Sequence, residues 1–342
     1  MVNQANASGS EERGIVLDGA KGGTFVVYDA DWQTPAITEL HAYRMALDAL
    51  PSAPGVAYLA FPWASLIDQI HSSGDSRLLQ AALDDVAKLT HRYAKVVTVC
   101  QHVALGRFAH LFETAGVTDI FWAHAGTPLA AGTFGATTIR PFPLYPVNSP
   151  GPSATVTKRH LFSFVGARPN AYYLDQTRTH ILEELGGAPG GLVVARDDWH
   201  FFSAVYHIQI EKRDIVIEDP LANAPAIEYR QALAESLFVL CPSGSGPNTL
   251  RLWEAIDCGA IPVIISPLFE PPGSARLWTI GTLNCDNSRE SIRQLPARLM
   301  RIAADTAQIE RMRGALAELR ARYGHGSFVS DITDFFRQAA AG

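Results

Sequence analysis

Short apolar runs alternate with amphipathic segments along the first half of the chain. The apolar runs predict buried strands at residues 23–29, 55–61, 95–100 and 119–125. The segments with the spacing of helices that bury one face are 34–50, 76–93 and 102–115, together with a shorter one through Ile67. Strands that alternate with helices are typical of a mostly parallel sheet covered on both faces. The first half therefore predicts one Rossmann-like domain.

The same alternation restarts after a turn-rich segment at residues 141–154. This segment contains five prolines, which cannot donate a backbone hydrogen bond to a sheet. The strands predicted beyond it are 160–166, 191–195, 236–242 and 260–266. The helices predicted beyond it are 173–185, one around Trp199, one around Tyr229, and 248–258, and residues 288–341 are largely helical. The chain is therefore expected to be an α/β protein with a second Rossmann-like domain.

These patterns set the expected domain boundaries. Residues 1–13 are polar and are expected to be a disordered lead, residues 14–150 to form the first domain and residues 151–325 the second. Residues 326–342 are expected to form a C-terminal helix that packs back on the first domain. A chain of 342 residues, 47% hydrophobic and only 18% charged, can bury two sizeable cores.

Charge, cysteines and hydropathy exclude several classes of protein. With 28 basic and 34 acidic residues the net charge is −6, and no cluster of Lys or Arg follows one face, so nucleic acid is not an expected partner. The four cysteines show no CxxC pair, which argues against a zinc site or a disulfide framework. No apolar run reaches the roughly 18 to 20 residues of a membrane helix, and Glu11 and Glu12 stand where a secretory signal needs apolar residues. A cytoplasmic protein is therefore expected.

A strand that runs into a glycine-rich turn and then a helix is the most informative part of the sequence. The turn contains Gly244 and Gly246, which let the backbone approach a ligand closely, and the helix N-terminus after it offers N–H groups to an anion. Arg251 adds positive charge, and Glu254, three positions on, can accept hydrogen bonds from ribose hydroxyls. The added hydroxyl donors are Ser243, Ser245 and Thr249. These residue types suit a nucleoside diphosphate.

Spacing alone leaves a second interpretation open. The glycines would then only make a tight turn, and Arg251 and Glu254 would form a surface pair of little energetic value. Gly244 is not followed by the Gly-Lys-Ser/Thr of a P-loop, and Thr249 stands where a GxGxxG motif needs its third glycine. Kinase and dehydrogenase interpretations are therefore disfavoured.

The stretch SLFVLCPSGSGPNTLRLWEAIDCGAIPVII, residues 236–265, resembles the hallmark of the exostosin family of glycosyltransferases. The family pattern is Ser-x-Phe-x-Leu-x-Pro-x-Gly, then Arg-Leu-x-Glu-Ala-Ile and Gly-x-Ile-Pro-Val-Ile. The matching positions are Ser236, Phe238, Leu240, Pro242, Gly244, Arg251, Glu254, Gly259, Pro262 and Val263. Upstream, LFSFVGARPN with Gly166, and then Arg178, resembles the segment that opens the donor domain of the family. The resemblance covers residues 161–272, and the first half resembles the family only weakly.

This resemblance implies the GT-B architecture, in which two Rossmann-like domains face each other across a cleft. The second domain would bind a nucleotide sugar, generally a UDP-sugar, the first would bind the acceptor, and transfer would invert the anomeric carbon. Arg251 would neutralise the diphosphate and Glu254 would hold the ribose, with Gly166, Arg168 and Arg178 at further phosphate or sugar contacts. The residues implied to face the diphosphate are Gly244, Ser245, Gly246, Asn248 and Thr249. An acidic residue that often follows the last matched strand is absent from residues 266–269, so sugar selectivity does not carry over.

Inverting transfer needs a general base and stabilisation of the departing diphosphate. No Asp-x-Asp follows a strand in the second half, so stabilisation by the helix N-terminus and Arg251 without a metal is expected, with Mg²⁺ or Mn²⁺ as the alternative. The base is expected at the carboxyl ends of the first-domain strands, and the candidates are His124, Asp31 and His102. The near-neutral pKa of imidazole suits His124 for this role. Asp29 and Asp31 have turn capping as their other interpretation.

Other functions stay open at this point. A CMP-activated acidic sugar is an alternative donor, with Arg168 and Arg178 serving its carboxylate. A second alternative is a non-catalytic subunit that binds a nucleotide sugar and has lost its base. A reductase is the third, and the glycine spacing disfavours it. For a transferase, the expected acceptor is a lipid-linked or protein-linked glycan in surface polysaccharide or glycoconjugate synthesis. Peripheral association with the inner membrane face would accompany a lipid-linked acceptor.

Overall fold

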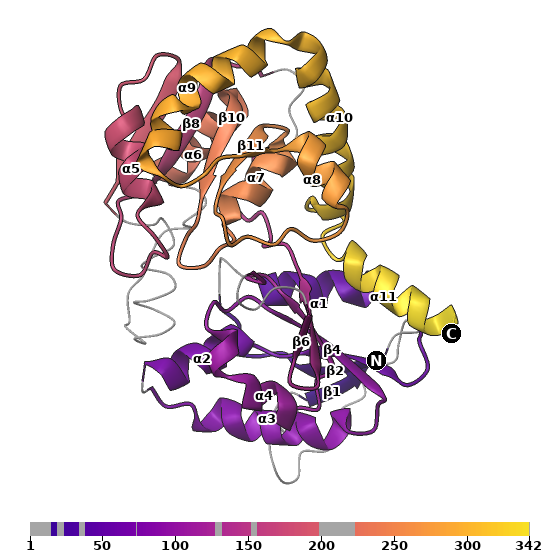
Figure 1. Cartoon of the computed structure of the whole chain (residues 1–342). Helices are drawn as coiled ribbons and strands as arrows, with labels where there is room; N and C mark the ends of the chain where they lie inside the picture. Colours follow the sequence, from indigo (N-terminus) through magenta and orange to yellow (C-terminus); the bar gives the residue numbers. More distant parts are fainter. Residues whose placement is uncertain are drawn as a thin grey trace, which may run out of the picture.

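Two α/β units, shown one above the other in Figure 1, make up the computed structural model of the chain. The structure describes residues 15–18, 24–33, 38–72, 74–126, 132–151, 156–197 and 223–341. The expected lead at 1–13 and the expected helix around Trp199 lie outside these ranges. The expected α/β class and pair of sheet-based units are confirmed.

The first unit is built on a seven-stranded sheet in the order β1-β2-β3-β4-β5-β7-β6. The strands are β1 (Ile15–Asp18), β2 (Phe25–Tyr28), β3 (Val56–Ala60), β4 (Lys95–Cys100), β5 (Asp119–Trp122), β6 (Gly132–Phe134) and β7 (Thr137–Pro141). The central strands from β2 to β5 and then β7 are parallel, and the edge strands β1 and β6 are antiparallel to their neighbours. The strand order of the parallel core follows the chain order, so this core has no point of reversal.

Helices cover both faces of the first sheet. α2 (Trp63–His71), α3 (Arg77–Thr90) and α4 (Ala109–Thr114) pack on one face, and α1 (Thr38–Ala49) and α11 (Ser330–Ala341) pack on the other. The helix predicted at 102–115 is instead the 3₁₀ turn η1 (Leu105–Arg107) followed by α4. The side chain of His102 accepts the Ala104 N–H at 3.0 Å, which fixes a turn directly after β4 and delays the helix.

The second unit has five parallel strands in the order β12-β11-β10-β8-β9. They are β8 (His160–Ala167), β9 (Gly191–Arg196), β10 (Ser236–Pro242), β11 (Ile261–Ile265) and β12 (Leu283–Asn284). The chain moves outward from β8 to β9 and then returns to β10 on the other side of β8, so the strand order reverses between β8 and β10. In open α/β sheets, ligands bind at the carboxyl ends of the strands at such a reversal.

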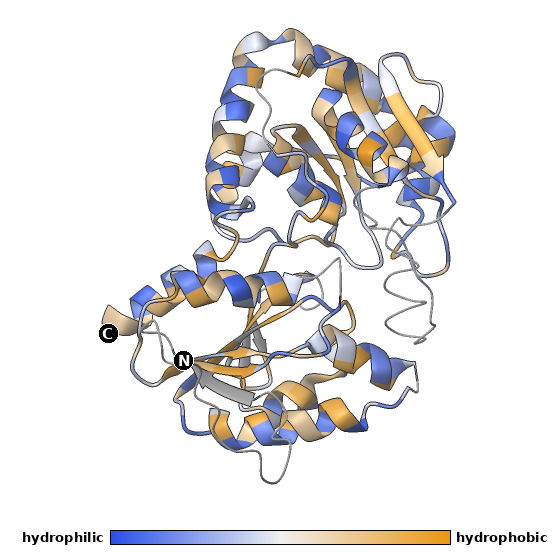
Figure 2. Ribbon diagram, turned by 180° about the vertical axis from the view of Figure 1, so that it is seen from behind, coloured by the Kyte–Doolittle hydropathy of each residue, from blue (hydrophilic) through white to orange (hydrophobic). Residues whose placement is uncertain are grey.

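Two helical layers enclose the second sheet. α5 (Thr177–Leu185) and α9 (Arg289–Ala304) pack on one face, and α6 (Ala224–Glu235), α7 (Leu250–Cys258) and α8 (Ala275–Gly281) pack on the other, while α10 (Thr306–Tyr323) contributes to both cores. Hydrophobic residues fill the strands at the centre of each unit, and hydrophilic residues lie on the outer helix faces (Figure 2). The helix predicted at 173–185 begins only at Thr177, and Asp175 accepts the Thr177 N–H at 2.9 Å in a turn directly before it.

The two units meet through buried polar contacts near the carboxyl ends of the sheets. The Asn248 side-chain amide donates to the Ala123 carbonyl at 2.6 Å, and the Asn148 N–H donates to Glu254 at 3.1 Å. Gly126 forms an isolated β-bridge with Phe269. Within the ranges the structure covers, no helix is long and apolar enough to cross a bilayer.

Candidate functional site

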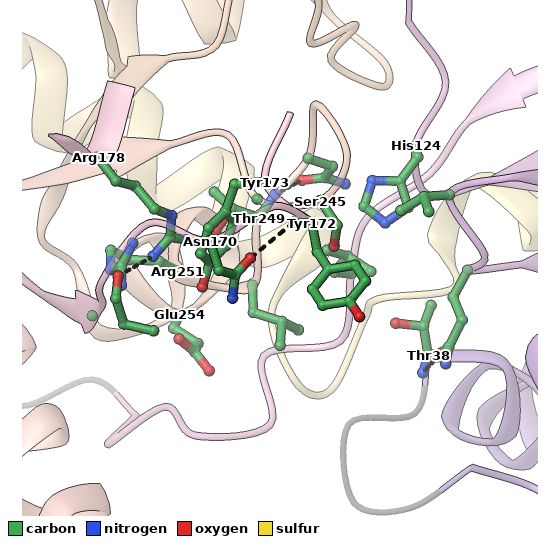
Figure 3. Close-up of a pocket in the computed structure, with 18 of the residues that line it drawn as sticks. Thr38, His124, Asn170, Tyr172, Tyr173, Arg178, Ser245, Thr249, Arg251 and Glu254 are labelled. Atoms are coloured by element: carbon green, nitrogen blue, oxygen red, sulfur yellow. Dashed lines mark hydrogen bonds between the residues drawn. The ribbon is translucent and has the colours of Figure 1, made fainter. Parts of the chain in front are cut away.

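A cavity of about 310 Å³ lies between the carboxyl ends of the two sheets. The first unit lines it with the polar residues Gln33, Thr38, Asp68, Gln101, His102 and His124. The second unit lines it with the polar residues Asn170, Tyr172, Tyr173, Arg178, Arg196, Tyr229, Ser245, Asn248, Thr249, Arg251 and Glu254. Figure 3 shows Arg178, Arg251 and Glu254 on one side, Thr38 and His124 on the other, and the Tyr172 ring between them.

Two buried arginines meet at the reversal of strand order. Arg178 on α5 and Arg251 on α7 are each 7% exposed. Both guanidinium groups lie beside Gly166 at the end of β8, where an added Cβ would be 2.7 Å from Arg251 Nη2 and 3.1 Å from Arg178 Nη1. Glycine at this position therefore leaves the space that both guanidinium groups need.

Neither of these arginines has a carboxylate partner within salt-bridge distance among the described residues. Arg178 donates only to the Ser243 and Ala167 carbonyls, at 3.3 and 3.4 Å, and Arg251 Nη2 donates to the Val165 carbonyl at 2.6 Å. Arg251 Nε and Nη1 are buried without a hydrogen-bond partner. The cavity wall thus holds two buried positive charges with no ion-pair partner among the residues that the structure describes.

Aromatic rings surround the two guanidinium groups. The Arg178 Cζ lies 4.1 Å from the centre of the Tyr173 ring, and the Arg251 Cζ lies 4.7 Å from the centre of the Phe164 ring. Burial, followed by repulsion from Arg251, lowers the pKa of Arg178 to about 10, so it stays charged at neutral pH. Cation–π contacts hold the side chains in place without supplying negative charge.

Glu254 lies one helical turn beyond Arg251 and is also buried. Its carboxylate accepts two hydrogen bonds, one from the Tyr229 hydroxyl at 2.5 Å and one from the Asn148 N–H at 3.1 Å. Burial raises the pKa of Glu254, while those two hydrogen bonds and the attraction of Arg251 oppose the rise. Arg251 and Glu254 are therefore not the exposed surface pair of the second interpretation.

Of the two glycines in the glycine-rich turn, Gly244 lines the cavity and Gly246 does not. A Cβ at Gly244 would come no closer than 3.9 Å to another residue, so the missing side chain leaves open space there. A Cβ at Gly246 would lie 2.4 Å from His124 Nδ1, so this glycine makes room for the histidine of the first unit. The Gly244 N–H bonds to the Gly246 carbonyl at 3.0 Å and the Thr249 N–H to the Asn248 side chain at 2.8 Å. Two amides expected to face an anion are therefore already used by the protein.

The structure separates the predicted nucleotide-binding residues into two groups. Those that line the cavity are Gly166, Arg178, Gly244, Ser245, Asn248, Thr249, Arg251 and Glu254. Those that do not line it are Arg168, Ser243 and Gly246. Arg168 is exposed and lies 3.5 Å from the exposed Asp197, on the solvent side of the strand end. Ser243 is buried behind the turn, where its carbonyl accepts from Arg178.

The three predicted base candidates occupy different environments. Asp31 does not line the cavity; its carboxylate accepts the Tyr28 hydroxyl at 2.8 Å, and it has a φ of 57°, as in a turn. His124 lines the cavity, and burial, with a smaller contribution from His102, lowers its pKa to about 3. His102 lines the cavity and has its Nε2 2.9 Å from an Asp68 oxygen.

Two charged residues of the cavity were not identified from the sequence. Asp68 is a single acidic residue on α2, and it meets His102 only because α2 packs beside the end of β4. Arg196 ends β9, one strand away from the reversal, and donates to Glu228 at 2.8 Å. A charged residue directly after a predicted parallel strand was a usable signal for Arg196. Asp68 had no comparable signal because it lies within a helix.

A metal site is not evident in the parts of the chain that the structure covers. No group of three or more His, Cys, Asp and Glu side chains is placed there to hold an ion. The four cysteines are free and buried.

The comparison with solved structures returns matches at low identity, some of them solved with UDP or UDP-glucose. HepE from Anabaena, solved with UDP-glucose, has 12% identity and a TM-score of 0.45 over 93% of this chain and 98% of its own. The pneumococcal O-GlcNAc transferase GtfA, solved with UDP and GlcNAc, has 14% identity and a TM-score of 0.42 over 88% of this chain. The GtfA/B complex has 12% identity and a TM-score of 0.41 over 89% of this chain. This chain spans 59% and 61% of those last two chains.

A family comparison identifies the part of the chain that carries the two arginines. No curated protein matches the sequence. Residues 133–279 match the model of the Exostosin GT47 domain, and this range includes β8, the glycine-rich turn and α7. The expected resemblance to the exostosin family is confirmed over residues 133–279, which match the GT47 domain of that family.

Proposed function

We propose that this chain transfers a sugar from a UDP-sugar to a hydroxyl of a glycan acceptor, with inversion at the anomeric carbon. The observation that carries the proposal is the pair of buried guanidinium groups of Arg178 and Arg251 beside Gly166. A buried charge without a partner is costly, so a wall with two of them is arranged for an anion that arrives from solution.

A diphosphate fits this wall in charge and shape. Guanidinium groups match phosphate oxygens with paired N–H donors, and Arg251 Nε and Nη1 have no hydrogen-bond partner among the described residues that a ligand would have to displace. The open space at Gly244 lets a ligand approach the turn closely. The carboxylate of Glu254, one turn from Arg251, is then available to ribose hydroxyls. The GT47 domain match favours UDP as the nucleotide.

The same two arginines would assist the chemical step. Negative charge grows on the diphosphate as its bond to the sugar breaks, and cations that are already in place stabilise that charge without reorganisation. Inversion follows from a single displacement in which the acceptor attacks from the side opposite the diphosphate. The polar wall of the first unit, across the cavity, is where that acceptor would bind.

Melting-temperature shifts with UDP, GDP, CMP and dTDP, each with and without Mg²⁺, test the donor site. A ligand that binds only the folded chain raises the melting temperature by mass action, and a ligand at 100 times its Kd adds about 2.7 kcal/mol. UDP is expected to give the largest rise, and the rise should be lost in Arg251→Ala. Arg168→Ala is the matched control, because Arg168 is exposed outside the cavity.

The panel also separates the alternatives. A rise with CMP alone would replace the UDP-sugar with a CMP-activated donor. A rise that persists unchanged in Arg251→Ala would place the nucleotide elsewhere on the chain. The absence of a rise with all four nucleotides would overturn the proposal.

A further inference from the structure

The first-unit wall of the cavity contains a carboxylate with a defined set of hydrogen-bond donors. Asp68 lies on α2 directly after the buried Leu66 and Ile67, and its side chain is 22% exposed. It lines the cavity that Arg178 and Arg251 line from the second unit. It is therefore a group on the acceptor side that a ligand in the cavity can touch.

The hydrogen bonds of His102 determine which partner of the Asp68–His102 pair accepts a proton. The Ala104 N–H donates to His102 Nδ1 at 3.0 Å, so Nδ1 carries a lone pair and the proton of the neutral ring is on Nε2. Nε2 lies 2.9 Å from Asp68 Oδ1 and donates to it. His102 thus has no free lone pair to offer an acceptor hydroxyl, while the Asp68 carboxylate does.

Two glutamines fix the other oxygen of this carboxylate. The Gln33 side-chain amide donates to Asp68 Oδ2, and Gln101 Nε2 donates to Gln33 Oε1 at 3.1 Å. Gln101 Oε1 in turn accepts the N–H groups of Thr38 and Glu39 at the start of α1. Each oxygen of Asp68 receives one hydrogen bond and keeps a second lone pair, so the carboxylate is held in one orientation and can still accept.

We infer that Asp68 is the general base of the transfer reaction, an assignment that rests on the proposed function. The carboxylate accepts the proton of the acceptor hydroxyl while that oxygen bonds to the anomeric carbon. The bond from the anomeric carbon to the diphosphate breaks at the same time, and its electron pair leaves with the diphosphate. The proton then passes from Asp68 to water. His102 and Gln33 are positioning residues in this assignment.

The other candidates are less suited to the role. His124 has a depressed pKa and its Nδ1 is buried against Gly246, where it has no hydrogen-bond partner. Asp31 lies outside the cavity. Glu39 is fully buried and its carboxylate accepts the N–H groups of Gln101 and Ala64, so it supports the network without reaching a ligand.

The test uses the full chain, a panel of UDP-sugars and water as the acceptor, with UDP release as the rate and UDP affinity measured separately. General base catalysis contributes about 10²- to 10⁴-fold, so Asp68→Asn should release UDP at least 100-fold more slowly with its UDP affinity within about twofold of the wild type. Formate, a small carboxylate, should restore part of the rate of Asp68→Ala, which a purely structural role does not predict. Asp31→Asn is the matched control and should leave the rate unchanged.

The outcomes of this test are distinguishable. Asp68→Asn with more than a tenth of the wild-type rate overturns the assignment, as does a wild type that binds UDP and hydrolyses no UDP-sugar. Failure of the wild type to bind any nucleotide counts against the proposed function itself. Should Asp68→Asn melt early, Asp68→Glu keeps the charge and the hydrogen bonds, and it should retain a measurable rate above that of Asp68→Ala.

Discussion

The two walls of the cavity satisfy their polar groups in opposite ways. On the first-unit wall, Asp68 and His102 are joined with Gln33 and Gln101 in one hydrogen-bonded network. On the second-unit wall, two buried arginines lie side by side, and their hydrogen bonds within the described residues go to carbonyl groups. A network that is complete in the free protein holds a reacting group in place, whereas a wall with uncompensated charge depends on a ligand. The second-unit wall therefore lowers the stability of the free chain, and the first-unit wall does not.

The largest effect is expected from substitutions that remove the positive charge of the second-unit wall. Arg178→Met with Arg251→Met should weaken UDP binding by at least 100-fold, since hydrogen bonds to charged groups contribute about 1.5–3 kcal/mol each and 1.4 kcal/mol is a factor of ten. The free variant should melt no lower than the wild type, because two uncompensated buried charges and their repulsion are removed. Calorimetry with UDP and thermal melting without it provide the two measurements.

A paired arginine of the first unit is the matched control for that variant. Arg140 bonds to the buried Asp119 at 2.8 and 2.9 Å. Arg140→Met should leave UDP affinity unchanged and lower the melting temperature, because Asp119 loses its charge partner. A double arginine variant that is destabilised as strongly as Arg140→Met would contradict the conclusion that Arg178 and Arg251 are uncompensated in the free chain.

The next effect concerns the contact between the two walls. Gly246→Ala places a Cβ 2.4 Å from His124 Nδ1, and overpacking of this kind costs about 1–3 kcal/mol. Denaturant unfolding should show this loss, and His124→Ala in the same chain should recover part of it. Gly244→Ala has no neighbour closer than 3.9 Å and should keep the stability of the free chain. Equal losses for the two glycines would contradict the close approach of His124.

The smallest expected effect is the pH dependence that His124 confers. Its pKa is lowered to about 3 in the folded chain, so between that value and the ordinary pKa near 6.5 the unfolded chain binds the proton more readily. The stabilisation is present above pH 6.5 and is lost as the pH falls, by about 2 kcal/mol between pH 8 and pH 5. His124→Gln should lose correspondingly less over that range in chemical denaturation. Parallel pH curves for the two proteins would show that His124 is not held neutral by burial.

Much of the parallel core was predictable because both faces of its strands are buried. The runs that became β2, β3, β4, β8, β10 and β11 are continuously apolar or nearly so. The β6–β7 pair was missed, because β7, next to the edge strand β6, has the sequence TTIRP, in which partly exposed residues alternate with buried ones. A pattern rule that looks for apolar runs does not find such a strand.

The residues of the site were predictable where they are close together in the sequence. They were not predictable where tertiary packing brings distant parts of the chain together. Arg251 and Glu254 are one helical turn apart and were found with the glycine-rich turn. Arg168, which was expected at a phosphate or sugar contact, does not line the cavity and is exposed beside Asp197. Asp68 and His102 are 34 positions apart, and only the packing of α2 beside β4 makes them a pair.

The first unit needs α11 to complete its core, and α11 is synthesised after the second unit. Phe328, Ile332 and Phe336 are completely buried in the core that α1 shares with the first sheet, in one cluster with residues such as Phe121. Domains generally fold from the N-terminus as they leave the ribosome, but this core lacks part of its apolar layer until residues 328–341 have emerged. The second unit has its core residues within β8 to α10 except for Ala123 and Leu144, which precede them in the chain, and it can fold first. The unit that is translated first is therefore expected to be the last to reach its native packing.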